Sequence, residues 1–157
     1  MKVLHVMTHL GQGGTEAVLY RLIKATHQKI NHSVVSLHGE GVYGPMLRKL
    51  GVDVEALDMP RGRLKLAGLW RLRQIIRDYN PDIIHTRLYH ADLVGGVVAL
   101  FSGASPVIWT VNSSDLGALR KSWKTRFIRQ ICAILSHWLP SAIVADAKNT
   151  KKVNVSL

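Results

Sequence analysis

The sequence is poor in acidic residues, nearly free of cysteine, and without any long apolar run. Ten Asp and Glu residues stand against 21 Lys and Arg residues, which gives a formal net charge of +11. This imbalance favours anionic partners such as phosphorylated ligands, acidic lipid or nucleic acid. Cys132 is the only cysteine, which excludes an internal disulfide, and its apolar helical surroundings predict a buried thiol in a reducing cytoplasm.

The longest apolar run covers residues 93–101, far fewer than the ~20 residues that span a bilayer. Met1 and Lys2 lead directly into an apolar strand pattern, without the apolar core and cleavage site of a secretion signal. We therefore expect a cytoplasmic protein that is soluble or peripheral to a membrane. A chain of 157 residues has room for one domain with a real core.

Short apolar runs alternate with amphipathic helical patterns along the whole chain, which is typical of a parallel α/β architecture. The predicted strands are residues 2–8, 32–38, 52–57, 82–86, 106–111 and 141–145. The predicted helices are residues 15–28, 44–50, 64–79, 90–102 and 120–139. Proline lacks the amide donor that a helix needs, so Asn80-Pro81 is expected to end the third helix and Leu139-Pro140 the fifth.

Two helices have distinct faces. In the third helix, Leu69, Leu72, Ile76 and Tyr79 are expected to face the core. In the fifth helix the larger apolar residues fall on one face, away from Arg126, Gln130 and His137. These apolar residues are Trp123, Phe127, Ile131, Ile134 and Trp138.

The first strand is followed by a glycine loop, Gly11-Gln12-Gly13-Gly14, which opens the first helix. Glycines allow the backbone to come close to an anion, and the N–H groups and dipole of the following helix attract negative charge. The loop therefore predicts a phosphate or anion site. The alternative is a tight turn without a ligand.

In parallel α/β sheets, ligands bind beyond the carboxyl ends of the strands. The candidate loops are therefore residues 9–16, 38–43, 85–90 and 112–115. His5 and His9 are four residues apart, but a strand-to-loop segment does not bring such a pair together on a metal. No metal site is predicted.

Four segments, in this order and spacing, resemble the amino-terminal half of the GT-B glycosyltransferases of family 4. They are Gly13-Gly14-Thr15-Glu16 at the start of a helix and residues 81–86, 109–111 and 136–144. The resemblance implies a retaining sugar transferase with two Rossmann-like domains facing a cleft. The first domain would bind the acceptor and the second the nucleotide sugar, which is a co-substrate rather than a cofactor.

Residues 1–157 look like the first of these domains alone, a Rossmann-like parallel sheet with helices on both faces. We expect this chain to have no transferase activity without a second Rossmann-like domain or chain. The resemblance implies a glycan or lipid-linked acceptor in cell-surface polysaccharide synthesis. The alternative is a non-catalytic partner subunit, or a truncated relic, that binds a phosphorylated or anionic ligand.

The predicted substrate-binding residues lie in or next to the glycine loop and at the ends of the predicted strands. The amides of Gly13 and Gly14 would reach a phosphate or a sugar hydroxyl. Glu16 would bind acceptor hydroxyls, or it only complements the helix dipole. His85 would line the cleft, or it packs beneath a loop. Arg87 would pair with a phosphate, or it is solvated at the surface.

Asn112 is the sixth predicted substrate-binding residue, and its amide would hydrogen-bond a hydroxyl. Family members usually have a histidine at this place, just after the fifth strand. The catalytic residues would lie in the second domain, so none is assigned here.

Basic residues occur along the third predicted helix and in the segment that precedes it, and others lie at the start of the fifth predicted helix. Such helices bind anionic membranes, although an ordinary solvated helix face is the alternative. A dinucleotide oxidoreductase is disfavoured because Glu16 stands where the last glycine of the fingerprint belongs. No recognition helix, zinc motif or aromatic RNA-binding motif is present, so we expect no specific nucleic acid partner.

Overall fold

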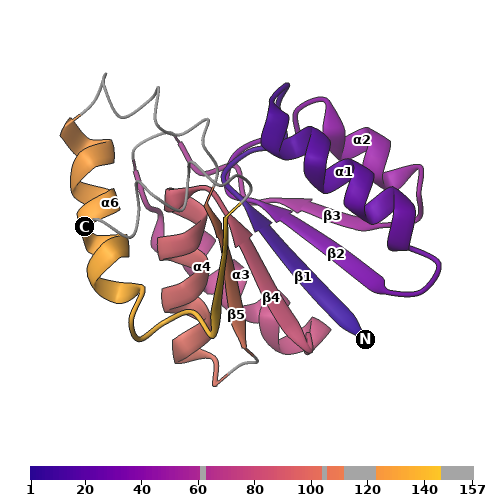
Figure 1. Cartoon of the computed structure of the whole chain (residues 1–157). Helices are drawn as coiled ribbons and strands as arrows, with labels where there is room; N and C mark the ends of the chain where they lie inside the picture. Colours follow the sequence, from indigo (N-terminus) through magenta and orange to yellow (C-terminus); the bar gives the residue numbers. More distant parts are fainter. Residues whose placement is uncertain (61–62, 104–105, 112–122, 146–157) are drawn as a thin grey trace.

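Six parallel strands form one sheet in the computed structural model, in the order β3-β2-β1-β4-β5-β6 (Figure 1). The structure describes residues 1–60, 63–103, 106–111 and 123–145. The strands are β1 (Lys2–Met7), β2 (Asn31–Ser36), β3 (Asp53–Ala56), β4 (Ile83–Arg87), β5 (Val107–Val111) and β6 (Ala142–Ala145). The helices are α1 (Gly14–Thr26), α2 (Tyr43–Arg48), α3 (Leu66–Tyr79), α4 (Tyr89–Phe101) and α6 (Trp123–Leu135). The predicted fold class is confirmed, and a strand or helix of the structure overlaps each predicted range; residues 120–122 of the fifth predicted helix lie outside the described residues.

Helices cover both faces of the sheet, with α1 and α2 on one side and α3, α4 and α6 on the other (Figure 1). Alternate strand residues therefore enter different cores. Val34 and Val54 join the core beneath α1 and α2. Leu4, Val6 and Ile84 join the core beneath α3 and α4. Burial on both sides explains why consecutive strand residues are apolar, as in Val34-Val35 and Ile83-Ile84.

The strand order reverses beside β1, which pairs with β2 on one side and with β4 on the other. The chain first moves outward from β1 to β3 and then returns across the sheet through α3. The two loops that follow β1 and β4 therefore open from neighbouring strands at the same edge. In open parallel sheets this reversal is the place where ligands bind.

The third helix ends as the sequence predicts. Asn80 adopts a left-handed conformation with φ of 45° and caps α3 before Pro81. Leu72 and Ile76 are fully buried, and Leu69 and Tyr79 pack against the same core. The predicted core-facing side of this helix is confirmed.

In the fifth predicted helix, α6, the side that is buried is not the side that carries the largest apolar residues. Cys132 is buried, as predicted, and Ile128 and Leu135 pack beside it. Phe127 and Trp138 are 56% and 88% exposed. The helix is apolar on more than one face, so periodicity alone did not identify the side that contacts α4. None of the described helices combines the length and apolar character needed to cross a bilayer.

Candidate functional site

The glycine loop connects β1 to α1 at the edge where the strand order reverses. Gly13 is the N-cap of α1, and its extended backbone lets Ala17 N–H donate to its carbonyl at 3.1 Å. The carboxylate of Glu16 folds back over Gly13, so a Cβ at this position would collide with Glu16 Oε2. Glycine at position 13 therefore makes room for a buried acid.

Glu16 is only 2% exposed, and its Oε1 lies 2.9 Å from His9 Nδ1. The His9 side chain is 44% exposed, so the pair links a buried carboxylate to a solvent-facing imidazole. Sequence reasoning considered His9 only together with His5 as a metal pair, rejected that pair, and missed the contact with Glu16. An acid three residues after the N-cap, preceded by a histidine in the same loop, is the signal that would have revealed it.

Gly14 differs from Gly13 in its surroundings. It is the first residue of α1 and is exposed, and a Cβ added to it meets no atom within 4 Å. The space on the Cβ side of Gly14 is therefore open to solvent. The predicted contact of Gly13 and Gly14 with a phosphate or hydroxyl stays a prediction, and Gly14 is the more accessible of the two.

The loop after β2 holds the glycine loop in place. Tyr43 N–H donates to the Leu10 carbonyl at 3.1 Å. Gly41 has φ of +53° and lies against the same carbonyl, so both its backbone angle and its close approach require glycine. Nearby, His38 Nδ1 lies 2.6 Å from the Met59 carbonyl oxygen. The edge is thus a set of mutually braced loops.

Arg87 ends β4 beside Met7, and its side chain is 4% exposed. A solvated surface role for Arg87 is therefore wrong. The next residue, Leu88, has φ of +76°, which is costly for a side chain with a Cβ, and it caps α4. Thr86 Oγ1 donates to the buried carboxylate of Asp92 at 2.5 Å and ties α4 to β4 across this strained junction.

His85 does not lie at the strand end that the sequence suggested. It sits two residues before the end of β4, on the face of the sheet that carries α1, with Nε2 2.6 Å from Thr110 Oγ1. Burial and then Arg87 lower the pKa of His85 to about 4. His85 and Thr110 line a hollow of about 240 Å³ on this face. His85 therefore lies below the loops rather than among them.

The structure brings Gly13, Gly14 and Glu16 together at the start of α1 and places Arg87 on the neighbouring strand. Asn112 lies outside the described residues. His90, at the start of α4, is a further polar group of this edge, and burial and then His38 lower its pKa. Within the described ranges, no three His, Cys, Asp or Glu side chains gather as metal ligands.

Comparison with solved structures identifies the class of fold. HepE from Anabaena, in complex with UDP and glucose, matches with a TM-score of 0.79 and 18% identity over 99% of this chain and 41% of HepE. MurG from Acinetobacter baumannii matches with a TM-score of 0.62 and 13% identity over 96% of this chain and 43% of MurG. The chain has the fold of one half of a GT-B enzyme.

The same fold occurs in an enzyme of another class. UDP-GlcNAc 2-epimerase from Neisseria meningitidis, bound to UDP-GlcNAc, matches with a TM-score of 0.62 and 17% identity over 99% of this chain and 43% of the epimerase. Fold alone thus does not separate sugar transferases from epimerases. No curated protein matches the chain in sequence.

The sequence model of glycosyltransferase family 4 makes the distinction, because it matches residues 12–153. The chain therefore belongs to glycosyltransferase family 4. It spans about two fifths of the length of the solved structures it matches.

Proposed function

We propose that this chain is the acceptor-side domain of a retaining sugar transferase, and that a second Rossmann-like domain or chain supplies the nucleotide sugar. The observation that carries this proposal is the family match over residues 12–153. The open glycine loop at the reversal of strand order is consistent with it. HepE binds UDP-glucose with a chain of which this one spans 40%, which leaves room for a separate nucleotide-binding half.

The acceptor is a glycan or a lipid-linked sugar of a cell-surface polysaccharide, as the family resemblance implies. Its hydroxyl or phosphate groups meet the amides of Gly13 and Gly14 and the polar edge formed by Glu16, Arg87 and Asn112. Glu16 is held by His9, and an acceptor hydroxyl would donate a hydrogen bond to its carboxylate. These residues bind and orient the acceptor, while donor chemistry belongs to the second half.

The test combines the purified chain with the polypeptide encoded directly downstream of residue 157. UDP release from UDP-sugars is measured with oligosaccharide and lipid-linked acceptors. We expect transfer from the pair and none from either part alone. Sugar transfer by residues 1–157 without a second polypeptide would contradict the division of labour proposed here.

A glycine pair provides a matched test of the site. Gly14→Ala adds a methyl group in open space at a helical position, so the domain should fold normally while the acceptor KM rises several-fold. Gly13→Ala pushes against the Glu16 carboxylate and should lower stability as well. Unchanged kinetics in the Gly14 variant of the active pair would remove this loop from the acceptor site.

A further inference from the structure

The approach to α3 and its first turns expose large apolar side chains. Leu64 is 62% exposed, Leu66 is 83% exposed and Trp70 is 59% exposed. No acidic residue stands between Asp58 and Asp78. An exposed apolar group of this size is unusual on a soluble domain and indicates an interaction surface.

These side chains are not a loosely packed part of the core, because the inner side of α3 is already filled. Leu72 and Ile76 are fully buried there. Gly68 lies so close to Met59 that an added Cβ would be 2.7 Å from the Met59 sulfur. Leu66 and Trp70, four residues apart, share the outer side of the helix.

Basic side chains accompany the apolar ones. Arg63 and Lys65 are exposed and alternate with Leu64 and Leu66. The Arg73 guanidinium lies 5.5 Å from the centre of the Trp70 ring, a cation–π contact. The surface therefore combines apolar insertion, an amphipathic tryptophan and positive charge.

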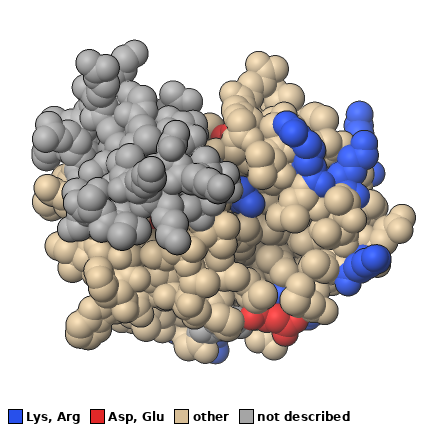
Figure 2. Space-filling model, viewed as in Figure 1, with Lys and Arg blue, Asp and Glu red and all other residues tan. Residues whose placement is uncertain are grey.

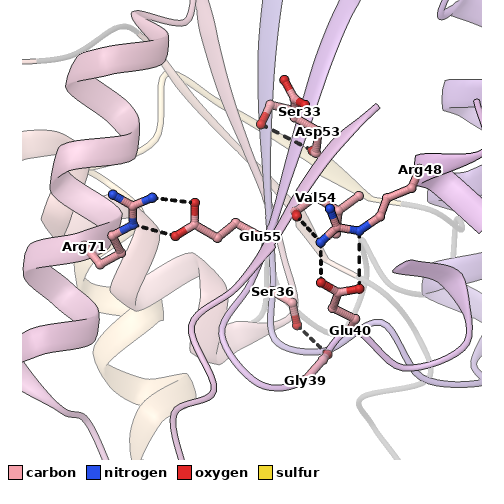
Figure 3. Close-up of polar contacts among 9 residues, drawn as sticks. All are labelled: Ser33, Ser36, Gly39, Glu40, Arg48, Asp53, Val54, Glu55 and Arg71. Atoms are coloured by element: carbon pink, nitrogen blue, oxygen red, sulfur yellow. Dashed lines mark hydrogen bonds and ion pairs between the residues drawn. The ribbon is translucent and has the colours of Figure 1, made fainter. Parts of the chain in front are cut away.

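Arg71 belongs to the fold rather than to this surface. Its Nε and Nη2 atoms donate to the two Glu55 carboxylate oxygens at 2.5 and 2.9 Å, which ties α3 to β3 (Figure 3). A fork of this kind fixes both side chains. The neighbouring Arg48 is held in the same way by Glu40 and by the Val54 carbonyl (Figure 3).

We propose that this surface, here called the α3 edge, docks on an anionic lipid bilayer. It consists of Arg63, Leu64, Lys65, Leu66, Trp70 and Arg73. Tryptophan favours the headgroup boundary, leucine favours the acyl region beneath it, and Lys and Arg are attracted to acidic headgroups. A nucleic acid would be attracted by the cations but would gain nothing from the exposed leucines between them.

The α3 edge lies beside the candidate site. Because α3 runs back across the sheet after β3, its first turn stands at the carboxyl edge of the strands, where the glycine loop also opens (Figure 1). A bilayer at this place would present lipid-linked molecules to the same edge. The inference extends the proposed function by naming the surface at which such an acceptor is met.

Positive charge is not confined to α3, and the experiment must account for this. Figure 2 shows Lys and Arg side chains gathered over the side of the molecule that carries α1 and α2. Charge attraction alone would therefore draw several surfaces toward acidic vesicles. The apolar residues and the position of the charges distinguish the α3 edge.

The first experiment measures depth by tryptophan quenching. The full chain is mixed with phosphatidylglycerol vesicles containing brominated acyl chains, and fluorescence is compared for Trp70→Phe and Trp138→Phe variants. Trp138 is the matched control because it is 88% exposed and lies just beyond α6. We expect Trp70→Phe to abolish most of the quenching and Trp138→Phe to preserve it. The reverse result would overturn the proposal.

The second experiment uses two double charge reversals with the same change in net charge. Arg63→Glu with Lys65→Glu alters the α3 edge, and Lys24→Glu with Lys29→Glu alters exposed positions in and after α1. We expect the first pair to lower cosedimentation about tenfold or more and the second to lower it less than about threefold. Circular dichroism and thermal unfolding confirm that both variants fold.

Equal losses of cosedimentation in the two double variants would contradict the proposal that the α3 edge is a specific lipid surface. Equal binding of the chain to neutral phosphatidylcholine vesicles would contradict it as well. The vesicles contain neither nucleotide sugar nor acceptor. A failure here leaves the transferase proposal untouched, because transfer to water-soluble acceptors is measured separately. Failure to detect transfer likewise leaves the vesicle result standing.

Discussion

The two faces of the sheet are made from the same strands yet differ in chemistry. On the side of α3 and α4, strand residues such as Leu4, Val6 and Ile84 are fully buried and apolar. On the side of α1, the corresponding positions of β1, β2 and β4 hold His5, His32 and His85. One face of this sheet contributes mainly hydrophobic burial, and the other combines burial with imidazoles whose pKa values burial lowers.

Hydrogen bonds assign the protons of two imidazoles on the α1 face. Thr26 Oγ1 donates to the Leu22 carbonyl at 2.7 Å, so it accepts from His32 Nε2 at 2.9 Å. His32 Nδ1 then accepts from His5 Nε2 at 3.0 Å. His5 Nδ1 is left as a buried acceptor with no hydrogen-bond partner in the described part of the chain. A proton added to His5 would point into a place that cannot solvate it.

The largest expected difference between the faces comes from two neighbouring residues of β4. Ile84→Ala removes a fully buried side chain from the α3 and α4 core and should lower the free energy of unfolding by about 2–5 kcal/mol. Ile83→Ala, at the hollow on the α1 face, should cost about 1 kcal/mol because Ile83 is only partly buried. Urea titrations followed by circular dichroism measure both. Equal losses would show that the two faces pack alike.

The second prediction concerns pH. Burial and then His85, His32 and Arg87 hold the pKa of His5 well below 6.5, and the pKa of His85 is lowered to about 4. The unfolded chain therefore binds more protons than the folded one below about pH 6.5. Stability is fully present above this pH and is lost as the pH falls toward 4, with His85 contributing about 2–3 kcal/mol of the loss.

A variant separates this effect from general acid sensitivity. His85→Gln should flatten the fall in unfolding free energy between pH 7 and pH 4.5, measured by urea titration at each pH. His137→Gln, at an exposed position beyond α6, is the matched control and should leave the slope unchanged. The same slope in both variants would mean that the imidazoles of the sheet face are not responsible.

The third prediction compares two adjacent glycines of α4, on the apolar side of the sheet. A Cβ at position 95 would lie 2.8 Å from Thr86 Cγ2, whereas a Cβ at position 96 would lie 3.4 Å from the Trp109 ring. Gly95→Ala should destabilise by about 1–2 kcal/mol because helix and strand must separate. Gly96→Ala should be near neutral, since the gain in helix propensity offsets the tight contact. Thermal unfolding of the two variants decides whether this packing is as close as described.

The smallest expected effect falls on the α1 face. Thr26→Val removes the hydroxyl that accepts from His32 and should cost about 1 kcal/mol. The loss of unfolding free energy should be smaller in a His32→Phe background, because the Thr26 hydroxyl then has no imidazole N–H from which to accept a hydrogen bond. A double-mutant cycle in urea provides this coupling energy. A coupling of zero would contradict the assigned chain of hydrogen bonds.

The sequence was sufficient for the fold because strand, loop and helix signals agree along the chain. Asn80-Pro81 ends α3, and Leu72 and Ile76 mark its inner side. The exposed stripe of α6 was not predictable in the same way, because that helix is apolar on several sides and only tertiary contacts select one. Periodicity indicates that a helix has an apolar face, but it does not say which of two such faces meets the core.

The candidate site was predicted at the level of loops rather than side chains. The glycine loop and the edge were found because strand ends and glycines are local features. The His9 and Glu16 pair, the burial of Arg87 and the inward position of His85 depend on rotamers and on neighbouring strands. Such features follow from packing between segments that are distant in sequence, which no local pattern records.

The position of β1 in the middle of the sheet also affects the order of folding. β1 is synthesised first, yet its pairing with β4 must wait until all of α1 through α3 has left the ribosome. Closing so long a segment costs conformational entropy and therefore slows the pairing of β1 with β4. We expect β1, β2 and β3 to assemble first, as an early nascent unit. Pulsed hydrogen exchange during refolding should protect β2 amides before those of β4 and β5, and simultaneous protection would disprove this sequence of events.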